Sequence, residues 1–125
     1  MKILLLLIGG SLGTVCRYGV NLLAARLWGT GFPWGTFSVN MVGCLLIGLA
    51  FGLAERATWV TPTVRLFFVT GFLGALTTFS SYAVETVNTA NTGSGYLAAM
   101  NFAANNIGGL ALVVAGMYLA KVIVF

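Results

Sequence analysis

The residues best suited to chemistry lie together in one interrupted apolar segment, residues 71–82, which reads GFLGALTTFSSY. Glycines, hydroxyl groups and aromatic rings break an apolar stretch that begins near Val64 and resumes at Ala83. Lipid offers no hydrogen bonds to unwound backbone or to stray hydroxyls, so such a break is tolerated only where it faces protein, water or an ion path. The interruption is therefore the first candidate for the functional site.

The composition is that of a membrane protein. Hydrophobic residues make up 59% of the 125 residues and charged residues 6%, and the mean hydropathy is +1.01. A soluble domain carries about 25% charged residues, so this chain cannot cover a water-exposed surface. With no histidine and two acidic residues, a zinc site or a catalytic triad is excluded, which argues against an enzyme. Cys16 and Cys44 lie in apolar runs and are interpreted as small hydrophobic residues.

Four segments are long enough to cross a bilayer, which takes about 20 apolar residues. They are residues 3–25, 35–54, 64–88 and 96–120. The first is too long for the apolar region of a signal peptide, which runs about 7–15 residues, so we expect a retained helix. The sequence thus predicts an all-α integral membrane protein, with residues 1–125 forming one four-helix membrane domain.

Glycine spacing and the charges bear on assembly. Gly9 and Gly13 are four residues apart, as are Gly48 and Gly52, and such pairs let helix backbones approach closely in lipid. The spacing leaves open whether the close contact is within one subunit or between subunits. Because four helices of this length enclose a pore poorly, we expect an oligomer.

Lysine and arginine counts favour neither orientation strongly. If the termini share a side, Lys2, Arg56, Arg65 and Lys121 lie there, whereas Arg26 lies opposite with Arg17 nearer to it. Four against two is a modest bias for a rule that depends on these counts, so single and dual insertion both remain open. The net charge of +4 is too thinly spread to indicate nucleic-acid binding.

Arg17 and Glu85 are ionisable residues away from the ends of predicted spans, where such residues are functional hypotheses by default. Arg17 lies in the first span and Glu85 late in the third. Either they shape the electrostatics of a polar vestibule, or each reaches the interface or pairs there. The first two spans contain no acid, although a proton-coupled cation exporter of this size would need one.

The neutral polar residues considered for a shared path lie in the second, third and fourth spans. They are Asn40 in the second, Thr77, Thr78, Ser80 and Ser81 in the third, and Asn101, Asn105 and Asn106 in the fourth. Any one of them can simply bond a neighbouring helix, but three helices carrying such groups favour a shared hydrated track. Phe79 and Tyr82 are three residues apart, and we expect their rings to stack along one helix face. Positive ring edges and neutral donors can bind a small anion weakly enough to release it, as conduction requires.

Three motifs resemble the fluoride channels of the Fluc (CrcB) family. They are GGSLGTVCRY at residues 9–18, GTFSVNMVG at residues 35–43 and TGFLGALTTFSSYAVET at residues 70–86. The resemblance implies a multi-pass protein of the bacterial inner membrane, with a broken third helix in each subunit. It also implies an antiparallel, dual-topology homodimer with fluoride pores and a structural sodium ion (Na+) at its centre.

The resemblance also assigns roles by position. Asn40 matches the pore asparagine and Phe79 the first phenylalanine of an aromatic box, while Arg17 and Glu85 match polar residues of helices one and three. The backbone carbonyls of Gly74 and Thr77 match the sodium ligands. The expected anion path comprises Asn40, Thr78, Phe79, Ser80, Ser81, Tyr82 and Asn106.

This chain departs from the family pattern at two places. Tyr82 stands where the second box phenylalanine is usual, which keeps the ring edge and adds a hydroxyl. Leu110 stands where the family often has serine, and Asn106, one turn earlier, occupies a position that is polar in relatives.

Three functions are therefore compared. The leading hypothesis is passive efflux of fluoride, since no ATP site or coupling acid is visible. The alternative is a small proton-coupled cation exporter, against which the missing acid in the first span and Arg17 argue. A helical scaffold without transport is favoured only if packing seals the polar break.

Overall fold

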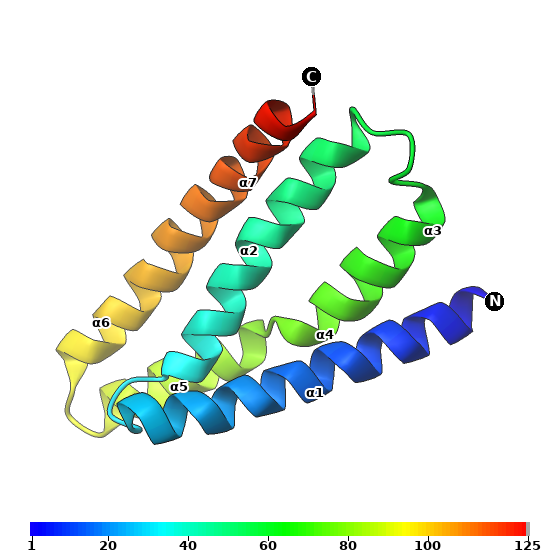
Figure 1. The fold of residues 1–125 in the computed structure, drawn as a ribbon. Coiled ribbons are helices and arrows are strands. Elements are labelled where there is room, and N and C mark those ends of the chain that lie inside the picture. Colours follow the sequence, from blue (N-terminus) through cyan, green and yellow to red (C-terminus); the bar gives the residue numbers. More distant parts are fainter. Residues whose placement is uncertain (125) are drawn as a thin grey trace.

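The computed structural model describes residues 1–124, and this part of the chain is helical without a strand (Figure 1). Four helices are long and apolar enough to cross a membrane: Lys2–Trp28, Trp34–Ala54, Pro62–Asn91 and Gly95–Ile123. Each predicted span lies inside one of these helices. The prediction of an all-helical protein with four membrane-spanning segments is confirmed.

The first two spans are single helices, and the last two are built from several helical pieces. Helices α1 and α2 are Lys2–Trp28 and Trp34–Ala54. The third span comprises α3 (Pro62–Arg65), the π-helical segment Leu66–Leu73, α4 (Gly74–Leu76) and α5 (Phe79–Asn91). The fourth comprises α6 (Gly95–Ala103), the π-helical segment Ala104–Gly108 and α7 (Gly109–Ile123).

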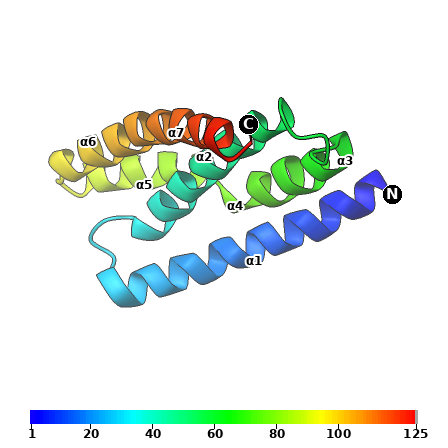
Figure 2. The same ribbon diagram turned by 45° about the horizontal axis from the view of Figure 1, so that its top comes forward.

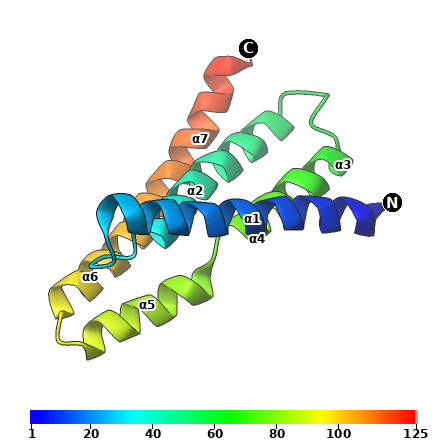
Figure 3. The same cartoon turned by 60° about the horizontal axis from the view of Figure 1, so that its bottom comes forward.

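The helices pack as neighbouring pairs. Helix α7 packs along α2, α5 packs against α6, and α1 lies along the first half of the third span, as Figures 2 and 3 show from two further directions. Both termini and the α2–α3 connection lie toward one end, and the other two connections lie toward the opposite end (Figure 1). Lys121 in the last turn of α7 and Arg26 in the last turn of α1 therefore lie at opposite ends.

Glycine determines how closely these helices approach. A Cβ atom at Gly48 would overlap with the Val113 carbonyl of α7, and one at Gly52 would come within 2.6 Å of the Ala120 side chain. A Cβ atom at Gly9 would lie 2.6 Å from the Phe67 carbonyl of the third span. Both small-residue faces are thus used within one subunit, which decides between the alternatives that their spacing left open.

The outer surface of the bundle is apolar. Leu7 on α1, Val87 on α5 and Val114 on α7 are among many exposed large apolar side chains. The buried core is small and centres on Val39 and Leu73, beside the interruption of the third span. A surface of this kind suits lipid or another membrane subunit.

Candidate functional site

Two extended residues separate α4 from α5. Helix α4 ends at Leu76, and Thr77 (φ −85°, ψ 156°) and Thr78 (φ −152°, ψ 118°) precede the first residue of α5. Thr78 caps α5, since its Oγ1 accepts a hydrogen bond from the Ser81 N–H at 3.2 Å, a role for which threonine is favoured. The Thr77 hydroxyl donates to the Leu73 carbonyl at 2.9 Å. We call these two residues the Thr77–Thr78 junction.

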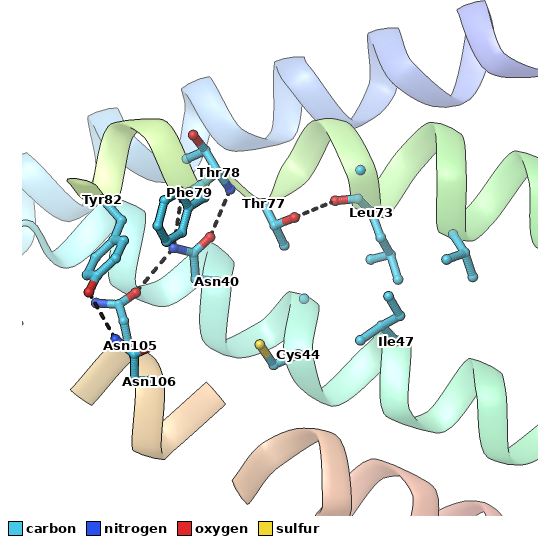
Figure 4. Close-up of a pocket in the computed structure, with 13 residues that line it drawn as sticks. Asn40, Cys44, Ile47, Leu73, Thr77, Thr78, Phe79, Tyr82, Asn105 and Asn106 are labelled. Atoms are coloured by element: carbon cyan, nitrogen blue, oxygen red, sulfur yellow. Dashed lines mark hydrogen bonds between the residues drawn. The ribbon is translucent and has the colours of Figure 1, made fainter. Parts of the chain in front are cut away.

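Asn40 of α2 holds the junction in place (Figure 4). Its Oδ1 accepts from the Thr78 N–H at 2.9 Å, and its Nδ2 donates to the Thr78 carbonyl at 3.2 Å. One carboxamide thus bonds both backbone groups of one residue, as a neighbouring strand would. Gly43, one turn further along α2, permits this approach because a Cβ atom there would overlap with Thr77 Cγ2.

The junction diverts two backbone donors from their helical acceptors. In a continuous α-helix the Thr78 N–H would donate to the Gly74 carbonyl, and the Ser81 N–H to the Thr77 carbonyl. Here those donors bond Asn40 Oδ1 and Thr78 Oγ1 instead. The carbonyls of Gly74 and Thr77, which the family resemblance implies as sodium ligands, thus lose their helical partners, and Gly74 lies exposed on the subunit surface.

A cavity of about 330 Å³ lies beside the junction. Residues of α2, of the third span and of the π-helical segment Ala104–Gly108 line it, and none of the lining side chains is charged. The structure brings five of the seven predicted path residues to this cavity: Asn40, Thr78, Phe79, Tyr82 and Asn106. Gly74 and Thr77 also line it.

The other two predicted path residues lie beside the cavity and do not line it. Ser81 Oγ accepts from the Thr78 hydroxyl at 3.1 Å, and Ser80 Oγ lies 3.4 Å from the same hydroxyl. The three hydroxyls form a cluster at the first turn of α5. This cluster reaches the cavity at Thr78.

Phe79 and Tyr82 contact each other but differ in their surroundings. Their ring centroids are 5.4 Å apart and their planes are tilted by 58°, so the rings are not stacked in parallel. Tyr82 is buried, and its hydroxyl accepts from Asn106 Nδ2 at 3.0 Å. Phe79 is 77% exposed, because its ring projects from the subunit at the edge of the cavity.

Glu85 and Arg17 are not brought together at one cavity. Glu85 lines a second cavity of about 350 Å³ between the end of α1, the start of α2 and α5. Its Oε1 accepts from the Thr36 hydroxyl at 2.8 Å, and within residues 1–124 its buried Oε2 has no hydrogen-bond partner. Arg17 lies half-buried on α1 and lines neither cavity.

The structure places at this cavity one asparagine that the predicted path omits. Asn105 lines the first cavity, and its Oδ1 accepts from Asn40 Nδ2 at 3.2 Å. The signal available in the sequence was the spacing of Asn101 and Asn105, which are four apart and therefore share one face of a helix.

Comparisons with known proteins agree over nearly the whole chain. The family model described as "CrcB-like protein, Camphor Resistance (CrcB)" matches residues 4–117. A "Fluoride-specific ion channel FluC" of Maridesulfovibrio salexigens is 44% identical over 123 residues, covering 98% of each chain. The protein of the same name from Chlorobium phaeobacteroides is 44% identical over 119 residues, covering 95% of this chain and 92% of the relative. That of Azobacteroides pseudotrichonymphae is 38% identical over 120 residues, covering 96% of each.

Proposed function

The chain belongs to the CrcB family, and from this premise we propose that it is a fluoride-selective channel through which fluoride leaves the cell passively. Relatives that match almost end to end carry the name of a fluoride-specific ion channel. The protein is accordingly a transporter and not an enzyme, and four apolar spans suit a multi-pass protein of the bacterial inner membrane.

The observation that carries this proposal is the uncharged cavity beside the Thr77–Thr78 junction. Fluoride is small and strongly hydrated, so donors at close range must replace its water. The Asn40 carboxamide can donate N–H groups, and the Phe79 ring can present its positive edge. Neutral donors of this kind bind an anion without trapping it, which permits rapid release. The hydroxyls of Thr78, Ser80 and Ser81 extend the donors along α5.

The wall of the path is completed by a second copy of the chain. The Phe79 ring is 77% exposed and cannot enclose an ion within one subunit. An antiparallel homodimer with dual topology would cover this face, and the modest bias of basic residues between the two ends suits insertion in both orientations. Glu85 and Arg17 would shape the electrostatics of the polar entrances.

A structural sodium ion at the dimer centre would be held by the backbone carbonyls of Gly74 and Thr77. The loss of the helical donors Thr78 N–H and Ser81 N–H supports the fit, because it frees these two oxygens. When bound, the ion supplies a positive charge that offsets the cost of carbonyls left unpaired in a dry interface.

An anion-flux assay in liposomes tests the proposed function. Purified protein is reconstituted into vesicles loaded with potassium fluoride or potassium chloride, and release is started with a potassium ionophore. We expect rapid fluoride release and no chloride release. Proton-driven uptake of an organic cation would instead support the exporter, and release at the rate of empty vesicles would leave only a scaffold.

A further inference from the structure

The junction allows the Asn40 carboxamide a single orientation. The Thr78 N–H requires an acceptor and the Thr78 carbonyl requires a donor, so Oδ1 faces the first at 2.9 Å and Nδ2 faces the second at 3.2 Å. An amide nitrogen carries two hydrogens. The second hydrogen of Asn40 Nδ2 is directed to Asn105 Oδ1, also at 3.2 Å.

Each following side chain is then oriented by the one before it. Because Asn105 Oδ1 faces Asn40, its Nδ2 faces away and donates to the Asn101 carbonyl and to Asn101 Oδ1, both at 2.9 Å. Asn101 Nδ2 in turn donates to Thr86 Oγ1 at 2.8 Å. The Thr86 hydroxyl then donates to the Tyr82 carbonyl at 2.7 Å.

The result is a chain of hydrogen bonds with one direction, which we call the amide chain (Asn40, Asn105, Asn101 and Thr86). It begins at the cavity and ends on the backbone of α5. Asn101 is 1% exposed and does not line the cavity, so it acts on a passing ion through its hydrogen-bond partners, of which Asn105 lines the cavity. Hydrogen bonds that point the same way polarise one another, and in a medium of low dielectric constant they are strong.

We propose that Asn105 and Asn101 are positioning residues for the anion path, an inference that rests on the proposed function. They hold in place the N–H that Asn40 Nδ2 donates to Asn105 Oδ1 beside the cavity. A passing anion replaces Asn105 Oδ1 as the acceptor of this N–H. When the anion leaves, Asn105 Oδ1 accepts this N–H again. The donor is therefore never left unpaired in the membrane, which would carry a large free-energy cost.

A double-mutant cycle tests the inference. Asn101→Leu and Asn105→Leu keep similar side-chain volume and remove the amides, and fluoride release is measured for both and for the double variant. We expect each single variant to release fluoride more slowly by about fivefold or more, because this factor corresponds to the net free energy of one hydrogen bond. The double variant should be no slower than Asn105→Leu alone, because the proposed role of Asn101 is to orient Asn105. Asn91→Leu, at the exposed end of α5, is the matched control and should conduct as the parent does.

The outcomes separate this inference from the proposed function. If the parent protein releases no fluoride, the proposed function fails. If the parent conducts and Asn101→Leu conducts equally, or if the two losses multiply, the positioning role is wrong. Should Asn101→Leu fail to fold, Thr86→Val and Thr86→Ser provide the same test at the far end of the amide chain. The valine variant should be slower and the serine variant normal, and equal rates would overturn the inference.

Discussion

Asn40→Asp tests the donor role of the Asn40 side chain separately from its acceptor role. The aspartate keeps an acceptor for the Thr78 N–H but loses both donor bonds, to the Thr78 carbonyl and to Asn105 Oδ1. It also places a negative charge in the cavity. We expect fluoride release to fall to the background rate and the unfolding free energy to drop by about 1–3 kcal/mol, since acceptors are left unsatisfied. Release at the parent rate would show that Asn40 does not donate to the ion.

Phe79→Leu tests the ring edge with little change in apolar bulk. Removing the quadrupole should slow fluoride release about tenfold, in line with the upper range for interactions of aromatic edges. Tyr82→Phe is the control, because the ring remains and Asn106 Nδ2 keeps its second bond, to the Phe102 carbonyl at 2.8 Å. Both variants are compared with the parent in the same vesicles. Normal conduction by Phe79→Leu would rule out ring-edge coordination at this position.

Single residues were predictable where a motif carried them. Asn40, Phe79 and Tyr82 stand out as polar or aromatic residues in apolar spans, and the structure places all three at one cavity. The partners of Asn40 were not predictable, because Thr78 is 38 residues away and Asn105 is 65 residues away. Only the packing of three helices brings them into contact. The roles of these residues in conduction stay predictions.

At the scale of the elements, Gly43→Ala should disturb the Thr77–Thr78 junction. The added Cβ atom would overlap with Thr77 Cγ2, so either α2 or the junction must move. Overpacking of this kind costs about 1–3 kcal/mol, and we expect a lower melting temperature together with slower fluoride release. Gly95→Ala, at the start of α6 with no atom within 4 Å of the new Cβ, should leave both unchanged. Equal effects of the two substitutions would contradict this account.

The carbonyls of Gly74 and Thr77 lead to a prediction on ion removal. Purified protein exchanged into sodium-free potassium buffer should lose thermal stability and conduct fluoride more slowly, because an ion that binds only the folded state stabilises it. Returning sodium should restore both properties. Melting curves and fluoride release at a series of sodium concentrations provide the measurement. A stability that does not change over that series would contradict a structural sodium site.

The elements were predictable in number and position and less so in detail. Apolar length alone located the four spans, with each structural helix extending one to three residues beyond the predicted range at most ends. Hydropathy carries no information on whether a backbone N–H bonds four or five residues back. The π-helical segments Leu66–Leu73 and Ala104–Gly108 were therefore not foreseen. The extended residues Thr77 and Thr78 lie within residues 71–82, which the sequence predicts as the interruption of the third span.

For the whole molecule, we expect subunits in both orientations in the membrane. Lys2 and Lys121 lie toward the end that holds the termini, with Arg26 opposite, and this bias is too small to fix one orientation. A cysteine tag at the C-terminus, labelled from each side of sealed vesicles with a reagent that does not cross membranes, should react from both sides. Labelling from the cytoplasmic side alone would refute dual topology.

The double attachment of Asn40 to Thr78 has an evolutionary consequence. The carboxamide that bonds the Thr77–Thr78 junction also faces the cavity, so selection for a folded subunit and selection for ion handling act on the same few atoms. A substitution at position 40 that changes ion handling therefore also changes the folding of the subunit. Adaptation to a different ion or membrane should therefore accumulate at neighbouring positions such as Tyr82 and Asn106, while position 40 stays fixed.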